Sequence, residues 1–194
     1  MGAVVISILT AEPLLAATRR IGTRFDRTTR REPLPGDEPA AGLRRHAIIL
    51  GYGRAGRAVA RVLGSRGFGW VAIDGDYSLA REAREAGAAI IYGEAGAPSV
   101  LDQARVTDAH AVIVAIPDAL ATRQAVVYAL SRNPRIEIVA RAHSDVEEAD
   151  LRRLGVARVV VAERELGHEL IRHALRRFGV SDREVAAFLE SRRR

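Results

Sequence analysis

The amino-acid sequence predicts an α/β fold with a doubly wound, parallel six-stranded sheet. Two features of the sequence predict it. Short apolar runs alternate with helical segments over most of the chain, and these runs are continuous in Val, Ile and Ala instead of alternating with polar residues. Continuous apolar strands are buried on both faces, as in parallel sheets covered by helices. Right-handed crossovers then favour the strand order 3-2-1-4-5-6.

The apolar runs define the expected strands, and the segments between them define the helices. Strands are predicted at 46–50, 70–74, 88–92, 111–116, 136–140 and 158–162. Helices are predicted at 54–65, 78–86, 98–105, 119–132, 145–154 and 163–178. The first helix is expected to bury Ala55, Val59, Val62 and Leu63 on one face.

Polar residues mark where the later helices begin. Ser144 or Asp145 is expected to cap the helix that follows strand five. Ser181 and Glu184 form a capping-box pattern and predict a last helix after it. The segment 163–178 carries one apolar stripe, and this stripe covers either its own sheet or a second copy of the chain.

The N-terminal region differs in composition from the rest. Residues 1–18 begin with an apolar stretch that is too short to cross a bilayer, which needs about 20 residues. Arginines follow it, as at the cytoplasmic end of a membrane helix. We therefore expect 1–18 to be the end of a transmembrane helix, with a disordered N-terminus as the alternative. Residues 19–43 are expected to be a basic and proline-rich linker, and 44–162 the folded domain.

Composition excludes several kinds of chemistry. The chain has no Cys, which excludes disulfides, thiolate nucleophiles and cysteine metal sites. All 30 basic residues are Arg, which excludes Schiff-base and P-loop lysines. The net charge is +6, but the arginines are spread along the chain and aromatic residues make up 5%. Nucleic acid is therefore not a predicted partner.

A glycine-rich loop follows the first predicted strand and opens the first predicted helix. It has the pattern G-x-G-x-x-G at Gly51, Gly53 and Gly56, which is typical of a Rossmann-like, dinucleotide-binding unit. Gly51 would allow the tight turn, Gly53 would let backbone amides approach a pyrophosphate, and Gly56 would let the helix pack closely. Arg54 and Ala55 lie in the loop, and Arg54 is placed to reach phosphate oxygens.

An acidic residue stands where a ribose should bind. Asp74 ends the second predicted strand, 23 residues after Gly51, and is followed by Gly75 and Asp76. An acid there accepts hydrogen bonds from the adenosine ribose and disfavours a 2′-phosphate. The pattern therefore favours NAD or a simple adenine nucleotide over NADP, and a loop that keeps the fold without binding a ligand is the alternative.

Ligands of such sheets lie beyond the carboxyl ends of the strands, so three further loops are candidates. Glu94 and Ala95 follow strand three and would approach the adenine. Ile116 and Pro117 follow strand four, and Arg141 follows strand five. Ordinary turn chemistry remains an alternative for each of these loops.

No catalytic constellation is apparent in the sequence. His168 and His173 are five residues apart and so point to different sides of a helix, which disfavours a shared metal. Only 32 residues follow the last predicted strand, too few for the substrate domain of a nicotinamide dehydrogenase. The sequence therefore favours a sensor over an enzyme, and a small NAD-dependent oxidoreductase is the alternative.

The motifs together resemble a known family. From His46 to Phe178 the chain resembles the RCK domain, also called the Trk-type N-terminal domain, and especially that of Kef-type, YbaL-like cation:proton antiporters. The stretches that carry the resemblance are HAIILGYGRAGRAVARVL, WVAIDGD, IIYGEAG, VIVAIPDALATRQAVVYALSRNPRIEIVARAHSD and VVVAERELGHEL. Glu94 departs from the family, which often has a shorter Asp or Asn at this position.

The resemblance implies a regulatory role. Such domains bind NAD(H) or AMP, gate potassium or proton movement, and dimerise through a crossover helix after strand six, here 163–178. Phosphate would lie at Gly51, Gly53, Arg54 and Gly56, the ribose at Asp74, and the adenine by Glu94 and Ala95. The expected partner is a membrane antiporter domain, in the same polypeptide or a separate chain, at the cytoplasmic face of the inner membrane. A stand-alone Trk-type potassium-uptake subunit is a further alternative.

Overall fold

The computed structural model describes residues 39–191. The predicted membrane-helix remnant at 1–18 and most of the predicted linker at 19–43 therefore lie outside the described residues. Among the helices that the structure does describe, none combines the length and apolarity needed to cross a membrane.

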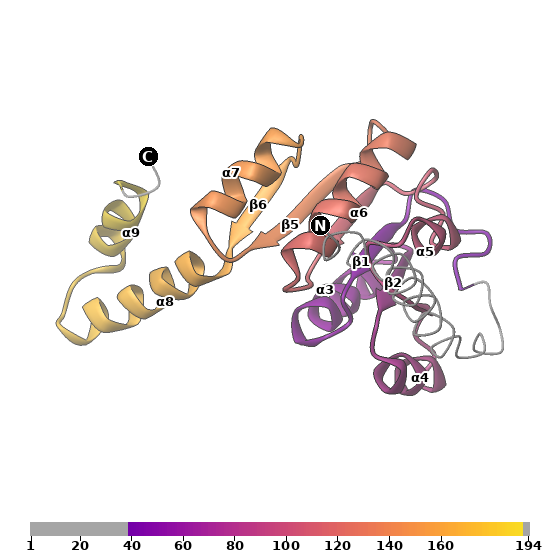
Figure 1. The fold of residues 1–194 in the computed structure, drawn as a ribbon. Coiled ribbons are helices and arrows are strands. Elements are labelled where there is room, and N and C mark those ends of the chain that lie inside the picture. Colours follow the sequence, from indigo (N-terminus) through magenta and orange to yellow (C-terminus); the bar gives the residue numbers. More distant parts are fainter. Residues whose placement is uncertain (1–38, 192–194) are drawn as a thin grey trace, which may run out of the picture. The chain divides into compact units, whose positions relative to one another are not determined.

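The described chain forms one parallel sheet of six strands in the order β3-β2-β1-β4-β5-β6 (Figure 1). This confirms the predicted fold class and the predicted strand order. The strands are β1 (Ala47–Leu50), β2 (Trp70–Asp74), β3 (Ile90–Tyr92), β4 (Ala111–Val114), β5 (Glu137–Ala142) and β6 (Arg158–Val161). The chain reverses direction along the sheet between β3 and β4, so β1 and β4 are neighbours at its centre.

Seven helices follow the strands in the described part of the chain, close to the predicted positions. They are α3 (Arg54–Ser65), α4 (Tyr77–Glu85), α5 (Pro98–Gln103), α6 (Ala119–Arg132), α7 (Asp145–Arg153), α8 (Ala162–Arg177) and α9 (Asp182–Ser191). The predicted caps are also present. The Ser144 hydroxyl accepts from the Glu147 amide at 3.2 Å, and the Ser181 amide donates to the Glu184 carboxylate at 3.1 Å.

The helices divide between the two faces of the sheet. α3 and α4 cover β1, β2 and β3 over a small apolar cluster of Ile49, Ala60, Ala72, Ala80 and Ile90. α5, α6 and α7 cover the opposite face over a larger cluster that includes Leu50, Leu101, Val126, Ile138 and Leu151. Burial on both faces explains why the strands read as continuous apolar runs.

The outer strands are open on the face that carries α3 and α4. The strand register places Ile49, Ile113, Val139 and Val160 on this face. Ile49 is fully buried, whereas Val160 in the edge strand β6 is 43% exposed. The described helices thus cover this face completely at β1 and leave it partly uncovered at β6.

Two local predictions were wrong in detail. On α3, the predicted apolar face included Ala55 and Val62, but Ala55 is exposed and Val62 is 60% exposed. The face that meets the sheet is instead Gly56 and Ala60, with Val59 and Leu63 beside them. α3 packs so close to the sheet that only small side chains fit on this face. Small residues give a weak hydrophobic signal, so the face could not be recognised from the apolar pattern.

The second difference concerns strand ends. β4 ends at Val114, two residues before the predicted end, and β5 runs to Ala142, two residues beyond it. Arg141 therefore lies within β5 and not in a loop after it. It pairs in register with Val160 of β6, so its backbone belongs to the sheet.

A buried histidine joins the start of β1 to α5. His46 is 1% exposed, and its Nε2 lies 2.8 Å from the carbonyl oxygen of Ala104. A carbonyl oxygen only accepts, so Nε2 carries the proton and donates. The residue therefore has a structural role in the core.

We predict that His46→Ala lowers the free energy of unfolding by about 1–3 kcal/mol, because it removes this donor and leaves a buried carbonyl without a partner. Urea unfolding would measure the loss. His110→Ala is the matched control, since His110 is exposed and should change stability by less than about 0.5 kcal/mol. Equal losses in the two variants would contradict the structural role of His46.

Candidate functional site

Gly51 and Gly56 are required by the packing of the loop itself. Gly51 has a φ of 93°, and a Cβ added there would lie 2.9 Å from Cγ2 of Ile116. A Cβ added at Gly56 would overlap the carbonyl oxygen of Gly51. These two glycines therefore fix the turn and bring α3 against the end of β1, as the sequence predicted.

Gly53 is different, because nothing in the described chain requires a glycine there. Its φ is −69°, which any residue can adopt, and no atom lies within 4 Å of an added Cβ. It is the N-cap of α3, without a side-chain cap, and the first turn of α3 contains no acidic residue. Space is therefore open beside the amino end of a helix, and the unpaired backbone amides of such an end can bind phosphate.

The carboxylate of Asp74 lies beside this loop. Its Oδ2 accepts from the Tyr52 amide at 2.6 Å, and its Oδ1 accepts from the Asp76 amide at 2.9 Å. A carboxylate has about four acceptor positions. Two backbone amides therefore hold Asp74 in place and leave acceptor capacity for the hydroxyls of a ribose.

The side chain of Tyr52 anchors the glycine loop to neighbouring residues. The Tyr52 ring stacks on Trp70 with 5.9 Å between ring centroids, and the guanidinium of Arg57 lies 6.0 Å from the Tyr52 centroid. The same residue thus positions Asp74 through its amide and packs against the α3/α4 cluster through its ring. Sequence reasoning missed Tyr52, since the middle positions of the G-x-G pattern carry no fixed residue type.

The loop after β3 comes close to the loop after β2. Oε1 of Glu94 lies 3.5 Å from the position of a Cβ on Gly75, so the exposed Glu94 carboxylate stands next to the Asp74 loop. Ala95 is 7% exposed and belongs to the core under α5, α6 and α7. Glu94 therefore offers a side chain to this region, whereas Ala95 can offer only its backbone.

A cavity of about 760 Å³ opens beside Glu94. It lies between the β3–α5 loop and α6, and its lining includes Gly96, Leu120, Ala121 and Gln124. Its size falls in the range of small-molecule pockets. The α6 residues were not predicted, because β4, which precedes α6, lies three places from β3 in the strand order; Gln124 of α6 nevertheless lies against Gly96 of the β3–α5 loop.

The remaining predicted residues divide into two groups. Ile116 contacts the Gly51 turn, and the exposed Arg54 opens α3 beside Gly53. Asp76, by contrast, caps α4 by accepting from the amides of Ser78 and Leu79. Arg141 lies two strands away from β1, and its charge acts on Glu163 in α8, so its surroundings differ from those of the loop.

The strand order, the glycine turn, the acid at the end of β2 and the open helix end define the chain as a nucleotide-binding type of Rossmann-like domain. Residues 47–162 match the model of the TrkA-N domain family. The chain belongs to the TrkA-N domain family.

The named relatives are longer than this chain and carry the names of ion-transport proteins. The chain is 32% identical over 126 residues to YbaL of Escherichia coli (strain K12), which carries the name of a cation/proton antiporter. It is 31% identical over 177 residues to the glutathione-regulated potassium-efflux system protein KefC of Cronobacter sakazakii. The matches cover 65% and 91% of this chain but only 23% and 28% of those proteins.

Solved structures agree with the fold and differ in their ligands. The Kef CTD of Shewanella denitrificans, in an AMP-bound form, has a TM-score of 0.67 and 27% identity, covering 75% of this chain and 88% of that one. The GsuK channel bound to NAD has a TM-score of 0.62 and 27% identity, covering 82% of this chain and 29% of that one.

We predict opposite effects for alanine at two glycines of the loop. Gly56→Ala should destabilise the fold by about 3 kcal/mol or more, because backbone atoms of the turn cannot move aside for the added methyl group. Gly53→Ala should leave the unfolding midpoint close to that of the parent chain, because its Cβ meets open space. Thermal or urea unfolding of both variants measures this contrast, and similar losses in the two would contradict the described loop geometry.

Proposed function

We propose that this chain is the nucleotide-sensing regulatory domain of a potassium or cation:proton antiporter, and that NAD(H) or AMP binding at the glycine loop gates ion transport. The observation that carries the proposal is the Asp74 carboxylate, held by the Tyr52 amide beside the open amino end of α3. This arrangement offers a hydroxyl acceptor and a phosphate site side by side.

In the proposed complex, each part of the ligand has its own contact. Phosphate would lie over Gly53 and accept from the amides at the start of α3, within reach of Arg54. The ribose hydroxyls would donate to Asp74. The base would enter the cavity beside Glu94, whose carboxylate can accept from the exocyclic amine of adenine.

The other residues predicted to bind the nucleotide are also part of the proposal. Ala55 would add its amide to the phosphate site, and Gly75 with Asp76 would border the ribose. Ala95 would border the base through its backbone. Ile116, Pro117 and Arg141 would lie toward the second half of NAD, beyond the pyrophosphate. AMP has no such second half, so these three residues would contact NAD alone.

Family membership supports sensing over catalysis, since the named relatives are transport proteins and a channel. In this proposal the chain is not an enzyme, and its partner is a membrane antiporter domain, in the same polypeptide or a separate chain. Its place would be the cytoplasmic face of the membrane. A small NAD-dependent oxidoreductase would instead turn over its nucleotide with a small substrate, and a stand-alone Trk-type subunit would bind a separate membrane protein.

We also propose that α8 forms a homodimer with a second copy of the chain. Two apolar residues of α8 are mostly exposed, Leu166 at 61% and Leu170 at 63%, and Phe178 at its end is 86% exposed. A row of exposed leucines one helical turn apart is a common helix–helix contact. Val160 on β6, shortly before α8, is a further partly exposed apolar residue.

Asp74→Ala should weaken nucleotide binding at least tenfold, because it removes the ribose acceptor. Calorimetric titration of the purified chain with AMP, NAD and NADH measures the affinity. At 100 times its dissociation constant, a bound nucleotide should also raise the unfolding free energy by about 2.7 kcal/mol. Asp150→Asn on α7 is the control and should bind like the parent chain. If no nucleotide binds the parent chain, the sensing proposal is wrong.

Leu166→Asp combined with Leu170→Asp should shift the chain from dimer to monomer, because two charges cannot be buried unpaired in a contact. Sedimentation velocity at several concentrations measures the shift. Val62→Asp on α3 is a matched control, since Val62 is 60% exposed, as these leucines are, and lies on another helix. A parent chain that stays monomeric throughout, or a double variant that stays dimeric, would overturn the dimer proposal.

A further inference from the structure

The first turn of α8 is held to the rest of the domain by a polar junction. Among the described elements, α8 packs chiefly against β6, which precedes it, and α9, which follows it. No side chain caps its amino end. Its orientation relative to the sheet therefore depends strongly on the contacts of its first residues, Glu163 and Arg164.

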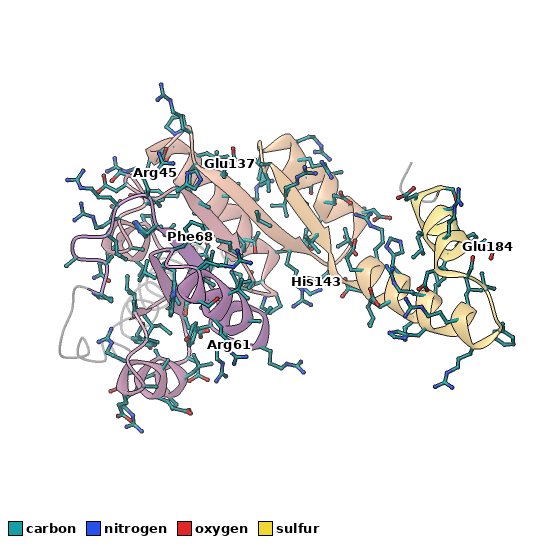
Figure 2. All side chains as sticks on the ribbon, turned by 180° about the vertical axis from the view of Figure 1, so that it is seen from behind. Arg45, Arg61, Phe68, Glu137, His143 and Glu184 are labelled. Atoms are coloured by element: carbon teal, nitrogen blue, oxygen red, sulfur yellow. The ribbon has the colours of Figure 1, made fainter. Side chains whose placement is uncertain are left out.

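These two residues make ion pairs with the loop and helix after β5. We call His143, Asp145, Glu148, Glu163 and Arg164 the α8 junction; His143 is labelled in Figure 2 where β5 ends and α8 begins. Nδ1 of His143 lies 3.2 Å from Oε1 of Glu163. Arg164 donates to Asp145 at 3.0 Å and to Glu148 at 2.8 Å.

The arginine half of the junction keeps its charges at physiological pH. An arginine does not lose its proton in proteins. Hydrogen bonds from Arg152 and Arg164 lower the pKa of Glu148 below its ordinary value. The ion pairs of Arg164 with Asp145 and Glu148 therefore do not change with pH near neutrality.

The histidine half is different. Hydrogen bonds from the Glu163 backbone amide and from the His143 ring lower the pKa of Glu163, so this carboxylate stays ionised. Histidine is the side chain that ordinarily changes charge between about pH 5 and pH 8. His143 is thus the one member of the junction whose charge can change with cellular pH.

Charged groups from three elements surround His143. Glu163 faces the ring from α8, and the backbone amide of His143 donates to Glu147 of α7 at 2.8 Å. Arg141 of β5 acts on Glu163 and offsets part of this negative charge. The added proton would sit on Nε2, which has no partner among the described residues, but the side chain is 36% exposed and a small ring movement brings it to solvent.

We propose that His143 and Glu163 form a pH-dependent latch that fixes α8 more firmly as pH falls. Glu163 is already ionised, so protonation of His143 turns a hydrogen bond between a neutral ring and a carboxylate into an ion pair and adds the attraction between two opposite charges. The latch goes beyond nucleotide sensing and does not depend on a bound ligand. It gives the domain a way to respond to protons directly, through the helix that carries the exposed leucines.

Amide hydrogen exchange of the ligand-free full chain, expressed as protection factors to remove the intrinsic effect of pH, tests the latch. Between about pH 8 and about pH 5.5, the amides of residues 165–167, the first in α8 with helical hydrogen-bond partners, should gain about two- to fivefold in protection, the range of a partly exposed ion pair. The gain should disappear in His143→Gln and in Glu163→Gln, each of which keeps a polar side chain without the ion pair.

His173→Gln is the matched control, because His173 pairs with Glu169 within α8 itself and does not reach the junction. This variant should keep the full gain. A flat response in the parent chain, an unchanged gain in His143→Gln, or loss of the gain in His173→Gln would each overturn the proposal. Because no nucleotide is present, failure here is separate from failure of the nucleotide site, which titration tests independently.

Discussion

The hydrogen bond from the Tyr52 amide to the Asp74 carboxylate is the contact on which the arrangement of the site depends. It joins the glycine loop after β1 to the end of β2, and a second bond from Asp76 fixes the other oxygen. Without it, the acid and the open amino end of α3 would belong to two independent loops. With it, the proposed hydroxyl acceptor and the proposed phosphate site would be held together before any ligand arrives, which would lower the cost of binding.

The three glycines of the loop differ in whether the fold requires them. Gly51 and Gly56 are needed because the chain passes close to itself, at Ile116 and at the Gly51 carbonyl. Gly53 has free space and an ordinary φ, so folding does not explain it. An anion bound at this helix end would explain why the space is open and why the first turn of α3 contains no acid.

Much of the fold could be predicted because its signals are local. Continuous apolar runs predicted the strands, and the handedness of crossovers predicted their order. The α3 face was predicted wrongly because close packing selects Gly56 and Ala60, which hydrophobicity does not highlight. Arg141 was predicted to follow the strand because a charged residue is unusual in a strand that is buried on both faces. Tyr52 and the α6 lining of the cavity depend on contacts between distant segments, which no local pattern shows.

Both the glycine loop and the α8 junction lie where strands of one parallel sheet end, the loop after β1 and the junction after β5 and β6. In the proposed sensor, a nucleotide can shift α8 only if it binds more tightly to one arrangement of the domain than to another. β4 lies between β1 and β5, and Arg141 in β5 acts on Glu163 of the junction. In the complex proposed above, Arg141 lies toward the second half of NAD, which AMP lacks. The proposal therefore implies that the two ligands act differently on α8 while sharing the same glycine loop.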